Sequence, residues 1–124
     1  MINILLVASG GAIGATIRFL STSYIKYLFP TFPIGTLVVN IIGSFSIGFL
    51  ISVMENRNIS SNIINYFVII GFLGSFTTFS AFSFEVIDMI NNKRFFLSVF
   101  YIFSSLLICF FCCYSGYNIN KIQF

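Results

Sequence analysis

The sequence predicts an all-α membrane protein with four transmembrane helices, the third of them broken. Of its 124 residues, 58% are hydrophobic and only 7% are charged, and the mean hydropathy is +1.03. This composition leaves too little polar surface for a water-soluble globule. The apolar residues gather into four long runs, and glycines and hydroxyl side chains interrupt the third.

The four runs are long enough to cross a bilayer as helices. A hydrocarbon core of about 30 Å requires roughly 20 helical residues. The expected spans are residues 4–29, 34–54, 63–90 and 95–117. No basic residue precedes the first run, so we expect a retained helix rather than a cleaved signal peptide. Residues 1–124 are expected to form a single transmembrane domain.

Residues 71–82 are the most informative part of the third run. They contain Gly71 and Gly74, several hydroxyls, and the closely spaced Phe79 and Phe82. We expect the backbone to leave the helix in this stretch. Each unpaired backbone group in hydrocarbon costs several kcal/mol, so a break is tolerated only where protein buries it or where it lines a polar cavity. The sequence therefore predicts a binding site for something polar.

Two short polar stripes follow the second and fourth runs. Their members recur every four residues, which places them on one helical face. They are Thr36, Asn40 and Ser44, and then Tyr101, Ser105 and Cys109. Such side chains also join helices to one another or bond back to their own helix, and this alternative stays open. Asn40 is the strongest candidate, because its amide requires partners in hydrocarbon.

Arg18 is a cation well inside a run. A charge at such depth faces the bundle interior or a water-filled vestibule, so Arg18 marks a place for an anion or for a carboxylate such as Glu85. Snorkelling to the interface is the alternative. Phe79 and Phe82 would present positive ring edges to a small anion. With 18 phenylalanines in the chain, core or lipid filling is the simpler interpretation of these two.

The charges near the ends of the runs and between them are nearly balanced. If the helices alternate in direction, one side holds two of these Lys and Arg residues and the other holds three. They are Arg57 and Lys121 on one side, and Lys26, Lys93 and Arg94 on the other. So small a bias predicts a weak preference for orientation, and two oppositely oriented copies would then pair. One fixed orientation is the alternative. Without a run of basic residues, we expect no nucleic-acid partner.

Two further spacings are weak indicators. Gly10 and Gly14 form a GxxxG pair, which favours close helix packing over a phosphate loop. Cys109 and Cys112 form a CxxC spacing, yet the chain has no histidine and no second cysteine pair. A metal or redox site at these cysteines is therefore not expected.

Three ordered motifs resemble the Fluc (CrcB) family of fluoride channels. The first covers residues 10–15 with Arg18, and the second covers 35–37 with Asn40 and 43–45. The third covers 71–74 and 77–80 with Phe82. The resemblance implies a passive fluoride channel of the cell (inner) membrane that catalyses no reaction. It also implies an antiparallel dimer, formed with a second copy or a paralogous subunit, with two fluoride pores and a sodium ion at its centre.

The resemblance also implies roles for individual residues. Backbone carbonyls of Gly74 and Thr77 would hold the sodium ion, and Arg18 would be the vestibule cation. The pore would be formed by Asn40, Phe79, Phe82, Tyr101, Ser105 and Cys109. The chain departs from the family pattern at Ser75, Ala81 and Cys109, and the last replaces a hydroxyl by a weak thiol donor.

Two other functions stay open. A small multidrug-type exporter is also a four-helix dimer, but it would need a carboxylate in the first span, where this chain has Arg18. In a non-transporting assembly subunit, the stripes and the break would be packing features only.

Overall fold

All regular structure in the described part of the chain is helical. The structure is a computed structural model that describes residues 1–119 and 121. Its elements are α1 (Ile2–Leu28), α2 (Ile34–Asn56), η1 (Ile63–Leu73), α3 (Gly74–Phe76), α4 (Phe79–Asn91) and α5 (Phe95–Ile119). Together they form four segments long and apolar enough to cross a membrane, at Ile2–Leu28, Ile34–Asn56, Ile63–Asn91 and Phe95–Ile119. These bounds lie within one or two residues of those expected from the apolar runs.

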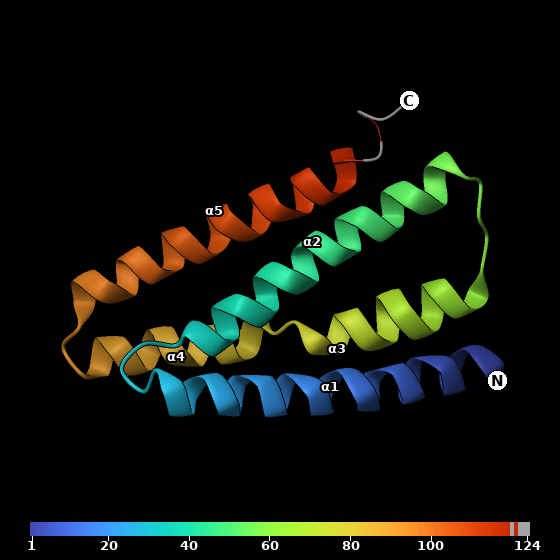
Figure 1. The fold of residues 1–124 in the computed structure, drawn as a ribbon. Helices are drawn as coiled ribbons and strands as arrows, with labels where there is room; N and C mark the ends of the chain where they lie inside the picture. Colours follow the sequence, from blue (N-terminus) through green and yellow to red (C-terminus); the bar gives the residue numbers. More distant parts are fainter. Residues whose placement is uncertain (120, 122–124) are drawn as a thin grey trace.

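The spans form two packed pairs. Helix α1 lies along η1 and α3, and α2 packs against α5 (Figure 1). The N-terminus and the connection from α2 to η1 lie at one end of the bundle, while the connections from α1 to α2 and from α4 to α5 lie at the other (Figure 1). The helices therefore alternate in direction, as expected. Apart from Arg18, the Lys and Arg residues divide two against three between the two ends of the bundle, as the sequence predicts.

Glycines bring the paired helices into backbone contact. A Cβ atom added at Gly10 or Gly14 of α1 would collide with the carbonyl oxygen of Phe67 or Phe72 in η1. Likewise, a Cβ at Gly48 of α2 would collide with the carbonyl oxygen of Cys113 in α5. Small residues allow this close approach in lipid, where no hydrophobic force drives helices together. The GxxxG pair of the first span thus packs the chain against itself.

The break in the third span is narrower than expected. Gly74 has helical dihedrals (φ −62°, ψ −30°), and no described glycine has a positive φ. Only Thr77 (φ −82°, ψ 156°) and Thr78 (φ −151°, ψ 120°) are extended. The expected break within residues 71–82 is therefore present but confined to Thr77 and Thr78, while Gly71 lies in the π-helix η1 and Gly74 in the short helix α3. Gly71 serves close packing instead, since a Cβ there would lie 2.8 Å from the Val7 carbonyl oxygen.

Candidate functional site

Most of the predicted site residues meet in one cavity beside the break. This cavity has a volume of about 280 Å³. The predicted residues that line it are Asn40, Gly74, Thr77, Phe79, Phe82, Ser105 and Cys109. They come from α2, α4, α5 and the segment around the break, so the cavity exists only because four separate parts of the chain converge. Tyr101 lies next to it, against the ring of Phe82.

Asn40 holds the break through the backbone of Thr78. Its Nδ2 donates to the Thr78 carbonyl at 3.0 Å, and its Oδ1 accepts from the Thr78 amide at 2.8 Å. The side chain thus replaces the two main-chain hydrogen bonds that Thr78 would have made in a continuous helix. One N–H of the Asn40 amide is left over from these two bonds, because a primary amide has two donors.

Thr78 also begins α4. Its Oγ1 accepts from the Ala81 amide at 3.2 Å and shares a 3.2 Å hydrogen bond with Ser80 Oγ. A threonine whose oxygen bonds the third amide of a helix is a favourable N-cap, worth about 1 kcal/mol. The extended Thr77–Thr78 pair is therefore stabilised from both sides, by Asn40 and by the start of α4.

The same bonds leave two carbonyl groups without their helical donors. In a continuous helix the Gly74 carbonyl would accept from the Thr78 amide, and that amide donates to Asn40 instead. The Thr77 carbonyl would accept from the Ala81 amide, which donates to Thr78 Oγ1. Carbonyl oxygens are suitable ligands for a hard cation. The two carbonyls expected to hold sodium thus fit that chemistry.

The two pore phenylalanines differ sharply in exposure. Their ring centroids lie 5.4 Å apart with planes at 46°. Phe82 is 6% exposed, whereas Phe79 is 70% exposed within the single chain. Phe82 therefore forms part of the buried wall of the cavity. The ring of Phe79 stands on the outer surface of the chain, next to the cavity.

The polar stripe on α5 consists of two hydroxyls, on Tyr101 and Ser105, and the thiol of Cys109. Ser105 is buried, and its Oγ has no hydrogen-bond partner among the described residues. Cys109 is half-buried and lines the same cavity. Tyr101 is fully buried and differs from the expected pore donor, because its hydroxyl already donates to Glu85 Oε2 at 2.8 Å.

Glu85 makes contacts that the sequence did not predict. It was expected as a possible partner for Arg18, but no ion pair joins these two among the described residues. Instead Glu85 Oε1 accepts from Thr36 Oγ1 at 2.5 Å, and Oε2 accepts from Tyr101. The signal was available, since a carboxylate inside a span marks a functional position by default. Its polar partners lie on other helices and were not predictable.

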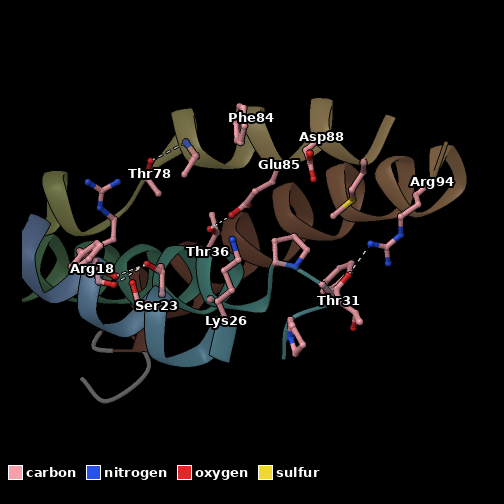
Figure 2. A pocket seen from close by; sticks show the side chains of 18 residues that line it. Arg18, Ser23, Lys26, Thr31, Thr36, Thr78, Phe84, Glu85, Asp88 and Arg94 are labelled. Carbon is pink, nitrogen blue, oxygen red and sulfur yellow. Dashed lines mark hydrogen bonds between the residues drawn. The ribbon is translucent and has the colours of Figure 1, made fainter. Parts of the chain in front are cut away.

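A second, larger cavity collects most of the charged residues of one end of the bundle. It has a volume of about 510 Å³ and is lined by Arg18, Lys26, Glu85, Asp88 and Arg94, among others. Figure 2 shows Arg18 and Lys26 entering it from α1, and Glu85 and Asp88 from α4. The buried Nε of Arg18 has no partner within residues 1–119. Thr78 lines both cavities and so lies between them.

Residues 5–117 match the family model described as CrcB-like protein, Camphor Resistance (CrcB). The chain belongs to the CrcB family. Its relatives in this family cover nearly its whole length. One is the Fluoride-specific ion channel FluC of Agrobacterium fabrum, 41% identical over 122 residues, which are 98% of each chain.

Two other CrcB-family relatives agree with this match. The Fluoride-specific ion channel FluC of Campylobacter fetus subsp. fetus is 41% identical over 124 residues, covering 98% of this chain and 96% of the relative. Fluoride-specific ion channel FluC 3 of Methanosarcina barkeri is 37% identical over 116 residues, covering 94% and 88%. As a CrcB-family protein with four helices able to span a bilayer, the chain is a multi-pass membrane protein. The exporter and the assembly subunit find no support in these matches.

Proposed function

We propose that this chain conducts fluoride passively across the cell (inner) membrane and so lowers cytoplasmic fluoride. The observation that carries the proposal is the cavity beside the break. It joins the buried, unpartnered hydroxyl of Ser105 to the rings of Phe79 and Phe82. A buried hydroxyl without a partner costs about 1–3 kcal/mol, so its presence in a cavity points to a ligand that accepts a hydrogen bond.

Fluoride conduction requires donors of moderate strength. A small anion must exchange its hydration water for groups that bind neither too weakly for entry nor too tightly for release. Ser105 supplies an O–H donor, and Asn40 supplies the N–H that Thr78 does not use. Phe79 and Phe82 supply positively polarised ring edges. We infer that these donors select fluoride over a larger anion such as chloride.

The charged cavity serves as the vestibule. Arg18, Lys26 and Arg94 contribute three positive charges, against two negative charges from Glu85 and Asp88. A concave site with excess positive charge raises the local concentration of anions. Because Thr78 lines this cavity and the one beside the break, an anion concentrated at Arg18 lies next to the pore entrance.

We further propose that two oppositely oriented copies form the channel. The exposed ring of Phe79 borders the pore cavity, so a second subunit is needed to close the wall on that side. The nearly balanced Lys and Arg residues allow both orientations. At the dimer centre, the Gly74 and Thr77 carbonyls would hold a sodium ion. This ion would supply a fixed positive charge that ties the subunits together.

Anion efflux from liposomes tests the function directly. The purified chain is reconstituted alone into liposomes that contain potassium fluoride or potassium chloride. Efflux of each anion is followed with an ion-selective electrode after valinomycin is added. We expect rapid fluoride loss and chloride loss close to that of protein-free liposomes. Equal efflux of both anions would refute fluoride selectivity. Fluoride efflux only on addition of a paralogous chain would refute the homodimer and leave the channel function intact.

A further inference from the structure

Four aromatic rings connect the loop between α1 and α2 to the cavity beside the break. Phe32 of that loop meets Tyr101 at 5.4 Å between centroids with planes at 79°. Tyr101 meets Phe82 at 5.2 Å and 52°, and Phe82 meets Phe79 at 5.4 Å and 46°. These distances and angles lie within the range of favourable aromatic pairs. We call the four residues the aromatic column.

The outer end of the column is held in place by the backbone of its loop. Phe32 lies between Thr31 and Pro33, and its carbonyl accepts from the Ile34 amide at 2.8 Å. Arg94, in the turn between α4 and α5, donates through Nη1 to the Thr31 carbonyl at 2.9 Å (Figure 2). Two connections far apart in sequence are thereby joined at the end of the bundle, with Phe32 beside the junction.

The middle of the column is constrained on three sides. The Tyr101 ring lies against Phe32 and Phe82, and its hydroxyl donates to Glu85. Tyr101 is 0% exposed, so protein atoms cover the whole ring and its packing depends on these contacts. Phe32 is itself packed against the core cluster that contains Tyr101 and Phe82. Removing the Phe32 ring would leave a void on one side of Tyr101, and close packing would be lost there.

We propose that Phe32 is a positioning residue for the pore. It holds the Tyr101 ring, which in turn sets the orientation of Phe82 beside the permeating anion. The loop between α1 and α2 thus influences conduction without touching fluoride. This inference rests on the proposed fluoride pore at Phe79 and Phe82, and its test separates the two.

The test compares substitutions at two phenylalanines of the same loop. Phe32→Leu removes the ring and is expected to slow fluoride efflux about three- to tenfold, the range that one lost aromatic contact supplies. Phe32→Tyr keeps the ring and should restore most of the rate. Phe29→Leu is the matched control, because Phe29 is 51% exposed and lies outside the column. It should conduct like the parent. Dimer content is measured by size-exclusion chromatography in every case.

A double-substitution cycle shows whether Phe32 acts through Tyr101. In a Tyr101→Leu background the column is already interrupted, so adding Phe32→Leu should change the efflux rate by less than twofold, because the two contacts are no longer independent. Rates are compared above the leak of protein-free liposomes, on fully dimeric protein.

Different failures have different meanings. A parent chain that releases no fluoride would refute the channel itself. A conducting parent together with a Phe32→Leu variant of equal rate would overturn the positioning role. The role would also be overturned if the fold reduction in efflux of the double variant equalled the product of the two single reductions. It would equally be overturned if the lower efflux rate of Phe32→Leu were fully explained by a lower dimer content.

Discussion

The Asn40 side chain bonds both polar groups of the Thr78 backbone: Nδ2 donates to the Thr78 carbonyl at 3.0 Å, and Oδ1 accepts from the Thr78 amide at 2.8 Å. An amide side chain on α2 thus takes the place of two main-chain bonds that the third span gives up. The exchange keeps the break free of unsatisfied groups at Thr78, as burial in a membrane requires. It also releases the carbonyl of Gly74 from its helical donor.

Replacing Asn40 should destabilise the break. In Asn40→Leu the Thr78 amide and carbonyl both lose their partner, which we expect to cost about 2–5 kcal/mol in unfolding free energy. Asn40→Gln keeps both the donor and the acceptor of the amide and should cost less. Thermal unfolding in detergent measures this order. Ser46→Ala, on the same helix and without a hydrogen bond to a described side chain, is the control. Equal stability of Asn40→Leu and the parent would contradict the two-bond account.

The ring edges of the pore are tested by isoleucine. Phe79→Ile and Phe82→Ile keep apolar bulk and delete the polarised edge, so fluoride efflux should fall at least about tenfold while dimers still form. Phe82→Ile should also lower stability by roughly 1–3 kcal/mol because this ring is buried. If both variants assembled and conducted like the parent, the proposal that fluoride contacts the ring edges would be wrong.

Cys109 should be the weakest hydrogen-bond donor of the polar stripe on α5 and should limit fluoride efflux. A thiol donates a poorer hydrogen bond than a hydroxyl, so Cys109→Ser should raise fluoride efflux, by about two- to tenfold if the new donor contacts the ion. Cys112→Ser is the matched control, because Cys112 does not line the cavity. A slower Cys109→Ser channel would show that the thiol is not limiting.

Charge placement tests the antiparallel pair. Asn91→Lys with Asn92→Lys changes the balance of Lys and Arg between the ends from three against two to five against two, which should impose one orientation and abolish efflux from cells. The opposite bias is set by Ser60→Lys, Asn62→Lys and Lys93→Asn. Co-expression of both forms should restore activity. Full activity from either form alone would exclude an antiparallel dimer.

Gly74 and Thr77 test the central cation. A Cβ added at Gly74 meets only the Ile69 carbonyl oxygen, at 3.7 Å, so Gly74→Val should fold within one subunit but fail where a second subunit or an ion approaches. We expect loss of dimers and of sodium-dependent stability. Thr77→Ser keeps the Oγ1 bond to Leu73 and should retain both. A Gly74→Val dimer still stabilised by sodium over potassium would refute carbonyl ligation there.

The resemblance to the CrcB family supplied the candidate pore residues, and the sequence by itself determined the membrane class and the four spans. These depend on local composition and helical period, which a single chain displays directly. It also located the break in the third span, because the hydroxyls of Ser75, Thr77, Thr78 and Ser80 and the neighbouring glycines contrast with the aliphatic residues that precede them.

Only the tertiary structure decided how these residues are used. The sequence predicted a break within residues 71–82, and the structure confines it to Thr77 and Thr78, while Gly71 stays in the π-helix η1 and packs against α1. The pairing of Glu85 with Thr36 and Tyr101 joins three separate spans. The packing of helices against one another determines these partners. The spacing of residues within one helix cannot predict which residue of another helix will bond a buried polar group.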